Sequence, residues 1–400
     1  MKLRSSFVFI VAFAALAFAG SVAIKAQTPM APAKYKDIQQ LKDVPADQID
    51  VTMQYFAASL GWTCLNCHVR DQATGVFAYE KNDKKEKVSA RGMIEMVRTV
   101  NAGDFGAKIN CATCHQGHND PLGLQPAQPY TEAQLAAMAA QAAAQAARQG
   151  GAGAGGARPG GPPQGAQPGG RGGTPPPPPP VEPIIEKFIT AMGGQAALDR
   201  LQSRITTGTV VNRANQSMAF TIEEKAGKFH IVVNDPRATI AWGFDGKSGW
   251  GQAGPVIADV DGFRLQQAMR LNDLRRASDF NTRYTNLQAG RPTRLPARTP
   301  GGTPINVSLV QGDLPNDVQE RLYFDATSGL LLRRQVISHT ALNGALVETI
   351  DYSDYKDVAG VQVPFTIKLN NWNTLDTYTV VDVKTGAQID DAQFVKPSVK

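Results

Sequence analysis

The chain has 400 residues, too long for one ordinary compact domain, and 42% of them are hydrophobic, enough to bury more than one core. The net charge of +6 is mild for this length, and no dense Lys/Arg block is interleaved with aromatic residues, which argues against nucleic-acid binding. Glycine and proline are concentrated between about residues 150 and 183 and divide the chain into two halves.

The first 26 residues have the layout of a secretory signal. Lys2 and Arg4 form a basic start, residues 7–19 are apolar, and small residues follow. No cysteine precedes Cys64, so lipoprotein anchoring is excluded. We therefore expect export to the periplasm. The alternative is an uncleaved signal that anchors the chain to the inner membrane, because residues 7–24 just reach spanning length.

All four cysteines lie in two copies of Cys-x-x-Cys-His, at residues 64–68 and 111–115. This pattern is typical of c-type haem attachment: two thioethers bond the haem vinyl groups, and the adjacent histidine becomes the proximal iron ligand. Disulfides or a zinc site are the alternatives, but neither requires histidine after the second cysteine. The predicted haem-binding residues are Cys64, Cys67 and His68 in the first motif and Cys111, Cys114 and His115 in the second.

A helix-like segment with a methionine on its apolar side precedes each motif. Apolar residues recur at i, i+3, i+4 and i+7 from Met53, and Gly61 follows as a stop. The same spacing recurs from Met93, between Ser89 as N-cap and Gly103 as stop. Methionine helix, turn and haem motif thus form an internal repeat of about 45 residues.

This segment resembles the cytochrome subunit of purple-bacterial photosynthetic reaction centres, in which methionine-bearing helices precede each haem motif. The likeness covers about residues 47–123 and rests on residues 52–53, 61–64, 91–101 and 111–117. That family carries four haem motifs and this chain two, so the likeness supports haem geometry and electron transfer rather than photosynthesis.

The resemblance implies His/Met ligation of both haem irons, by His68 with Met53 and by His115 with Met93. Such six-coordinate irons leave no open position, so we expect low-spin electron-transfer haems. Met96 competes with Met93, but Met93 aligns with Met53. His118 is the main alternative ligand. It lies only three residues after the second proximal histidine, so we expect a surface or propionate-contacting role instead.

Residues 125–182 are predicted to be a linker. An Ala/Gln-rich helix opens with a capping box at Thr131 and Gln134, and a glycine-rich stretch and a proline run follow. We expect no fixed tertiary structure and no chemistry here, so that the two halves of the chain move relative to one another.

Residues 183–400 are predicted to form an α+β domain. An amphipathic helix over residues 183–201 breaks at Gly193 and Gly194, and another helix is expected over residues 257–277. Short alternating segments separated by turn residues occupy most of the rest. The pattern predicts one antiparallel curved sheet, a half-barrel, with covering helices.

This half resembles the outer-membrane lipoprotein-carrier and sorting family. The likeness rests on residues 322–331, 351–355, 361–365 and 390–394. It implies a hydrophobic cavity between sheet and helices that takes an acyl chain. No catalytic constellation is visible: His230 and His339 fit structural or surface roles, and adjacent carboxyls at residues 390–391 diverge.

The sequence therefore predicts a multidomain exported dihaem cytochrome: signal peptide 1–26, mostly α-helical dihaem domain 27–124, linker 125–182 and lipoprotein-carrier-like domain 183–400. Expected partners are periplasmic redox proteins and a hydrophobic ligand, lipid or quinone, in the C-terminal domain. The alternatives are a dihaem peroxidase, which needs one five-coordinate haem, and a lipid- or lipoprotein-binding protein with accessory haems.

Overall fold

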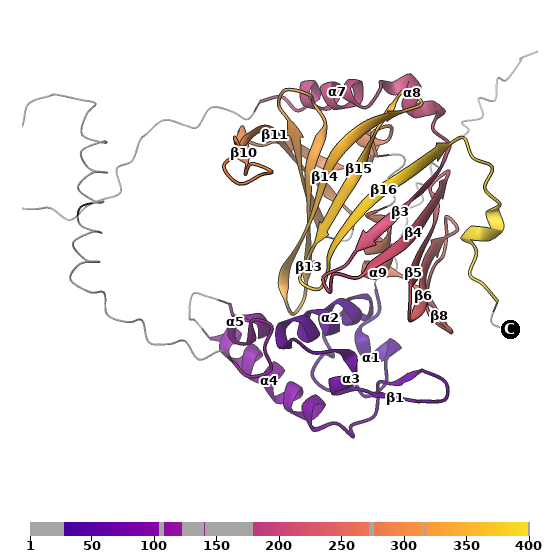
Figure 1. Cartoon of the computed structure of the whole chain (residues 1–400). Coiled ribbons are helices and arrows are strands. Elements are labelled where there is room, and N and C mark those ends of the chain that lie inside the picture. The colour runs from indigo at the N-terminus through magenta and orange to yellow at the C-terminus, as the bar shows by residue number, and fades with distance from the viewer. Residues whose placement is uncertain are drawn as a thin grey trace, which may run out of the picture.

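The computed structural model describes residues 28–103, 108–121, 140, 179–271, 276–315 and 317–398. Figure 1 shows two parts, which we call the helical module (residues 28–121) and the half-barrel (residues 182–398). The predicted signal segment and nearly all of the predicted linker lie outside the described residues. Within the described ranges, no helix combines the length and the apolar character needed to cross a membrane.

The helical module contains both predicted methionine helices. Its elements are α1 (Ala31–Lys34), η1 (Ala46–Gln48), α2 (Ile49–Leu60), α3 (Cys64–Cys67), β1 (Val69–Arg70), β2 (Phe77–Ala78), α4 (Lys85–Ala102) and α5 (Cys111–His115). α2 carries Met53, and α4 carries Met93 and Met96. α3 and α5 hold the two Cys-x-x-Cys-His motifs.

The predicted stops of both methionine helices are confirmed, but the predicted start of the second helix is wrong. α2 ends at Gly61, whose φ of 65° is a left-handed conformation that glycine adopts without strain. α4 ends at Gly103 but begins at Lys85 rather than after Ser89. Lysine and glutamate are good helix formers, and Glu86 in the first turn suits the positive end of the helix dipole, so the helix extends N-terminally.

The half-barrel is built on one antiparallel sheet. Its elements are α7 (Glu182–Ala191), α8 (Gln195–Arg200), β3 (Ser203–Val211), β4 (Ser217–Lys225), β5 (Lys228–Asp235), β6 (Ala238–Phe244), β7 (Gly249–Ala253), β8 (Val256–Val260), α9 (Gly262–Met269), α10 (Phe280–Arg283), β9 (Thr285–Ala289), β10 (Thr293–Leu295), β11 (Ile305–Leu314), β12 (Val318–Asp325), β13 (Leu331–Thr340), β14 (Gly344–Val358), β15 (Val361–Asn370), β16 (Leu375–Thr385) and η2 (Asp391–Phe394). The 14 strands run in the order β10-β11-β12-β13-β14-β15-β16-β3-β4-β5-β6-β7-β8, with β9 paired to β11. β3 pairs with β16 in the middle, and β8 and β10 remain as unjoined ends, so the sheet is open.

Alternating burial explains how these strands pack. In β5, Phe229, Ile231 and Val233 are buried, while the residues between them are partly exposed. This period of two places one face of the sheet on the core. α7 and α8 lie across one end of the sheet and α9 near the other (Figure 1). The predicted α+β half-barrel with covering helices is confirmed.

One predicted helix of the half-barrel is wrong. Residues 257–277 do not form a single helix, because β8 occupies their start and α9 begins only at Gly262. Gly262 has a φ of 51°, and a Cβ there would lie 2.3 Å from the Cβ of Asp47. The turn before α9 therefore needs glycine, both for its backbone conformation and for its close approach to the helical module.

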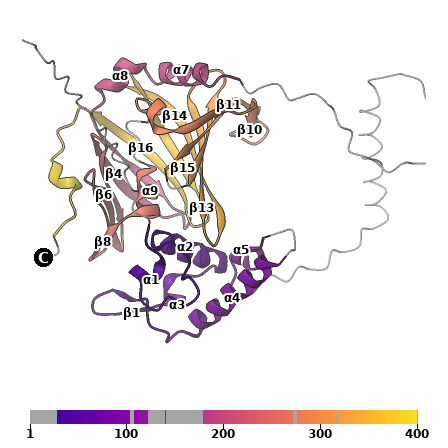
Figure 2. The same cartoon turned by 180° about the vertical axis from the view of Figure 1, so that it is seen from behind.

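The helical module packs against the end of the half-barrel where α9 lies (Figures 1 and 2). Ion pairs join Lys34 Nζ to Asp261 Oδ2 (3.0 Å) and Arg264 Nη1 to Asp50 Oδ2 (3.1 Å). Between the two parts lies an apolar contact that we call the docking cluster: Val51, Tyr55, Phe263 and Leu346, with Phe56, Ala112 and Trp372 packed against them. The linker is thus not the sole connection between the two parts.

Candidate functional site

The two Cys-x-x-Cys-His motifs fold into the same local structure. The residue before the first cysteine and the residue before the second cap one another. The Thr63 N–H donates to Asn66 Oδ1 (2.9 Å) in the first motif. In the second, the Asn110 N–H donates to Thr113 Oγ1 (3.0 Å), and the Thr113 N–H donates to Asn110 Oδ1 (3.2 Å). These caps hold one helical turn, which brings the two cysteines of each motif to the same side.

The four cysteines, all among the described residues, form no disulfide. Cys64 and Cys114 are exposed, whereas Cys67 and Cys111 are half-buried, and burial raises the pKa of these two thiols. In the described part of the chain, no three His, Cys, Asp or Glu side chains gather into one group. The structure therefore does not bring the two cysteine pairs into the shared four-ligand site that structural zinc requires.

The ring of His115 is oriented by the backbone. Its Nδ1 lies 3.1 Å from the carbonyl oxygen of His118. With the proton on Nδ1, this hydrogen bond leaves the Nε2 lone pair available for a metal ion, as is usual for metal-binding histidines. His118 itself is exposed, and it acts on the site through its carbonyl group. A main-chain role of this kind leaves no signal in the residue pattern.

His68 lies in a different environment. Burial lowers its pKa, and the nearby cations of Lys87 and Arg91 lower it further, which favours the neutral imidazole that binds iron. Its ring meets the Tyr79 ring edge-on, with centroids 5.0 Å apart. Its Nδ1 is buried and has no hydrogen-bond partner among the described residues.

The methionines considered as iron ligands differ in their exposure to solvent. Met53 is partly buried and packs against the small core of the helical module, beside Ile49 and Ile94. Met93 and Met96 are each 46% exposed. Their equal exposure gives no basis for choosing between them, so the alignment of Met93 with Met53 remains the argument for Met93.

Each methionine helix packs directly on the motif of the other repeat. α2 lies against α5: the Gly117 N–H donates to the Ser59 carbonyl (2.7 Å), and a Cβ on Gly61 would lie 2.2 Å from the Gly117 carbonyl oxygen. α4 lies against α3, with Lys87 and Arg91 next to His68. A macrocycle cannot lie between α2 and α5, whose backbones are in such close contact.

Asn101 holds the second motif to the end of α4. Its side-chain amide donates to the Ile109 carbonyl (2.8 Å), and its Oδ1 accepts the Ile109 N–H (2.8 Å). This two-way bond fixes the chain just before Cys111. Asn101 and Ile109 are eight residues apart and no sequence pattern connects them, so this contact could not be predicted.

The chemistry and surface of the helical module fit haem. A cavity of about 540 Å³ opens beside His68, with Leu65 and Val69 as apolar walls and Arg70, Asp71, Gln72 and Lys84 as polar ones. Of the 12 strongly exposed large apolar side chains in the described residues, seven belong to this small module, and a bound macrocycle would cover such side chains. These seven are Met30, Leu65, Val76, Tyr79, Val88, Met93 and Met96.

The half-barrel has a second cavity, of about 100 Å³, between the sheet and its helices. Phe188 of α7, Leu198 of α8 and Leu271 after α9 contribute apolar walls. Tyr355 also lines it and donates from its hydroxyl to the Leu331 carbonyl (2.7 Å). Burial raises the pKa of Tyr355 far above its usual value, so this phenol stays protonated.

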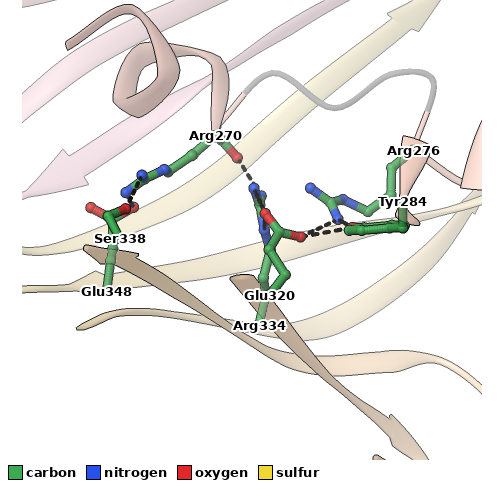
Figure 3. Close-up of polar contacts among 7 residues, drawn as sticks. All are labelled: Arg270, Arg276, Tyr284, Glu320, Arg334, Ser338 and Glu348. Atoms are coloured by element: carbon green, nitrogen blue, oxygen red, sulfur yellow. Dashed lines mark hydrogen bonds and ion pairs between the residues drawn. The ribbon is translucent and has the colours of Figure 1, made fainter. Parts of the chain in front are cut away.

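Figure 3 shows a buried ionic network, two of whose members, Arg270 and Arg276, line this cavity. Glu320 is fully buried and accepts from Arg334 Nε (2.8 Å), Arg276 Nη1 (3.0 Å) and the Tyr284 hydroxyl (2.7 Å). Burial raises the pKa of Glu320, but Arg334 and Arg276 outweigh burial and hold that pKa well below its usual range. A carboxylate with these partners is compensated in charge, and it stiffens the sheet.

A second buried ion pair holds the C-terminal end of α9 against the sheet. Arg270 Nη1 lies 2.6 Å from Glu348 Oε1, and the Arg334 Nη1 donates to the Arg270 carbonyl (3.2 Å). Glu348 Oε2 also accepts from the Asn371 amide (2.7 Å). These residues could not be predicted, because arginine and glutamate far apart in the chain leave no local pattern.

The two parts of the chain are similar to different known proteins. The family described as the photosynthetic reaction centre cytochrome C subunit matches residues 11–121. The photosynthetic reaction center cytochrome c subunit of Rubrivivax gelatinosus is 34% identical over 107 residues, covering 22% of this chain and 28% of that protein. The resemblance of the N-terminal part to this family is confirmed, and the match spans under a third of that relative.

Two solved structures are similar to the C-terminal part. A LolA superfamily protein from Nitrosomonas europaea is 13% identical with a TM-score of 0.38, covering 54% of this chain and 97% of that one. An outer membrane lipoprotein-sorting protein domain from Vibrio parahaemolyticus is 12% identical with a TM-score of 0.36, covering 53% and 94%.

Proposed function

We propose that this chain is an exported c-type cytochrome that transfers electrons through two covalently attached haems in the helical module. The half-barrel would bind a hydrophobic ligand or a partner protein. The observation that carries the proposal is the repeated capped turn, which presents two cysteines and a histidine in the same way at α3 and α5. The match of this region to the reaction-centre cytochrome family supports it.

The residues of each motif have distinct roles in this proposal. Cys64 and Cys67, and likewise the second cysteine pair, form the thioethers. His68 and His115 are the proximal ligands, and the His118 carbonyl keeps the His115 ring in one orientation. Haem, when bound, supplies reversible one-electron chemistry at its iron.

Met53 and Met93 are proposed as the distal ligands of the first and second irons. Because α2 packs directly on α5, no haem fits between these two helices. The support for pairing His68 with Met53 and His115 with Met93 is the repeat itself, in which a methionine helix precedes each motif. With one histidine and one methionine bound to it, each iron would have no open position for a substrate, so we propose an electron carrier rather than an enzyme.

Export to the periplasm and redox partners there complete the proposal. The signal-like first 26 residues and the c-type motifs support the compartment. For the half-barrel, the apolar cavity under α7, α8 and Leu271 supports a hydrophobic ligand, lipid or quinone.

Paired cysteine replacements test the haem count. Cys64→Ala with Cys67→Ala, and separately Cys111→Ala with Cys114→Ala, should each halve the covalent haem per chain. His118→Ala is the matched control, and it should keep both haems because the contact to His115 uses its backbone carbonyl. Covalent haem is measured by absorbance of the denatured protein; loss of all haem from one pair, or of none, would contradict two independent sites.

A further inference from the structure

We propose that α9 couples the half-barrel cavity to the docking of the helical module, so that an apolar ligand large enough to fill the cavity releases the module. The inference rests on the proposed ligand-binding role of the half-barrel. It assigns the helical module of the same chain as the partner of the surface around α9.

The N-terminal end of α9 holds the helical module. Phe263 is 7% exposed and packs with Val51 and Tyr55 of α2 in the docking cluster. Arg264 pairs with Asp50 at the rim. The same cluster includes Ala112 of the second haem motif, so docking covers part of the surface next to that motif.

The other end of α9 closes the cavity. Leu265 and Leu271 pack on the inner face of the sheet, and Leu271 and Arg270 line the cavity. Arg270 is fastened to Glu348 and lies over the Phe263 ring, 5.5 Å from its centroid. A displacement at the cavity therefore reaches the docking residue Phe263 through one short helix.

The cavity is too small for an acyl chain, so part of the half-barrel must move before such a ligand binds. About 100 Å³ is below the roughly 300–1,000 Å³ of pockets that hold small molecules, so an acyl chain does not fit this state. The strands around the cavity are hydrogen-bonded to neighbours on both sides, which makes them rigid. The elements left to move are α7 with α8, or α9 with Arg270 and Leu271 at its C-terminal end.

The contact between the helical module and the half-barrel has features that weaken it. Four buried polar atoms on the segments that form it have no hydrogen-bond partner among the described residues: Asp47 Oδ1, Thr52 Oγ1, Asn343 Nδ2 and Trp372 Nε1. Each unpaired polar atom destabilises the docked state, because it could form a hydrogen bond to water if the contact opened. The two rim ion pairs are solvent-exposed, so they contribute little.

Haem quenching of a fluorophore tests the coupling in the full-length holoprotein. Val381→Cys places a label on a side chain that is 71% exposed on β16, and the native cysteines are occupied by haem. Oleate is the probe for an acyl chain. Because undocking takes the label away from the haems, saturating oleate should raise the fluorescence at least about twofold.

Variants at the docking surface supply the reciprocal test. Phe263→Ala should raise the fluorescence without oleate and tighten oleate binding about fivefold or more, since linkage is reciprocal. Val347→Ala, an exposed neighbour of Leu346, is the matched control and should change neither. If Phe263→Ala fails to fold, Val51→Ala, which removes another side chain of the docking cluster, serves instead and should act in the same direction.

Two outcomes would overturn the coupling, and they are distinguishable. Oleate binding with unchanged fluorescence would mean that the cavity opens through α7 and α8, and the ligand-binding role would stand. Failure of oleate to bind at all would remove both the ligand-binding role and the coupling.

Discussion

Gly61 lies directly against Gly117: a Cβ on Gly61 would come within 2.2 Å of the Gly117 carbonyl oxygen. Gly61 ends the first methionine helix, and Gly117 follows the second haem motif by two residues. The two repeats are therefore locked together at the points where their regular structure ends. Any side chain at Gly61 would separate α2 from α5.

Gly61→Ala should destabilise the helical module by about 1–3 kcal/mol, because alanine is strained at φ 65° and would collide with backbone. Gly92→Ala is the matched control: Gly92 lies inside α4 and a Cβ there meets nothing within 4 Å. That change should stabilise by about 0.5–1 kcal/mol through helix propensity. Chemical unfolding of the holoprotein, followed by the haem absorbance, measures both, and equal stability of the two variants would contradict the proposed lock.

Met53→Ala and Met93→Ala should each remove one of two methionine–iron bonds. Each variant should lose about half of the weak methionine–iron charge-transfer absorbance, and the potential of one haem should fall, because the thioether favours the ferrous state. Met96→Ala should keep the full band and both potentials. A redox titration followed by optical spectra measures this. If Met96→Ala and Met93→Ala exchange their effects, Met96 is the ligand.

Glu320→Ala should destabilise the half-barrel by about 3–5 kcal/mol, because it leaves Arg276 and Arg334 buried without the carboxylate. Asp351→Ala is the control, since Asp351 pairs with Arg333 where both side chains are partly exposed (38% and 28%). That loss should cost at most about 1 kcal/mol. Denaturant unfolding at neutral pH compares the two variants, and similar costs would contradict the importance of burial.

Ionisation of the Asp376 carboxyl should lower the stability of the folded protein as the pH rises from acid to neutral. Burial raises its folded pKa to about 6, from an ordinary value of 3.8. The folded state therefore binds the proton more tightly than the unfolded state, so stability is lost as the pH rises through this window. Asp376→Asn should remove this loss, and the variant should gain relative to the natural protein at pH 7 but not at pH 3. Melting temperatures at the two pH values test this; a gain at pH 3 alone would contradict it.

Most elements of the helical module could be predicted from sequence, because they depend on residues close together in the chain. The haem motifs, the two methionine helices and their glycine stops depend on residues close together in the chain, and the structure forms all of these elements. The start of α4 differed because Lys85 and Glu86 extend the helix beyond Ser89. Capping rules describe which residue can begin a helix and do not prevent an earlier start.

Long-range contacts could not be predicted. Phe263 and Ala112 meet in the docking cluster although about 150 residues separate them. Arg270, Glu320 and Glu348 have no spacing that marks them as partners. The predicted helix over residues 257–277 failed because its apolar residues are shared between β8 and α9, and short apolar runs fit both structures.

The most direct test of the central claim is an optical and magnetic spectrum of the purified oxidised protein, with haem counted per chain. Two covalent haems are expected, both low-spin, with the methionine–iron band present and no rapid reaction with hydrogen peroxide. High-spin iron that reacts with peroxide, together with a missing methionine–iron band, would contradict this expectation and point to a dihaem peroxidase.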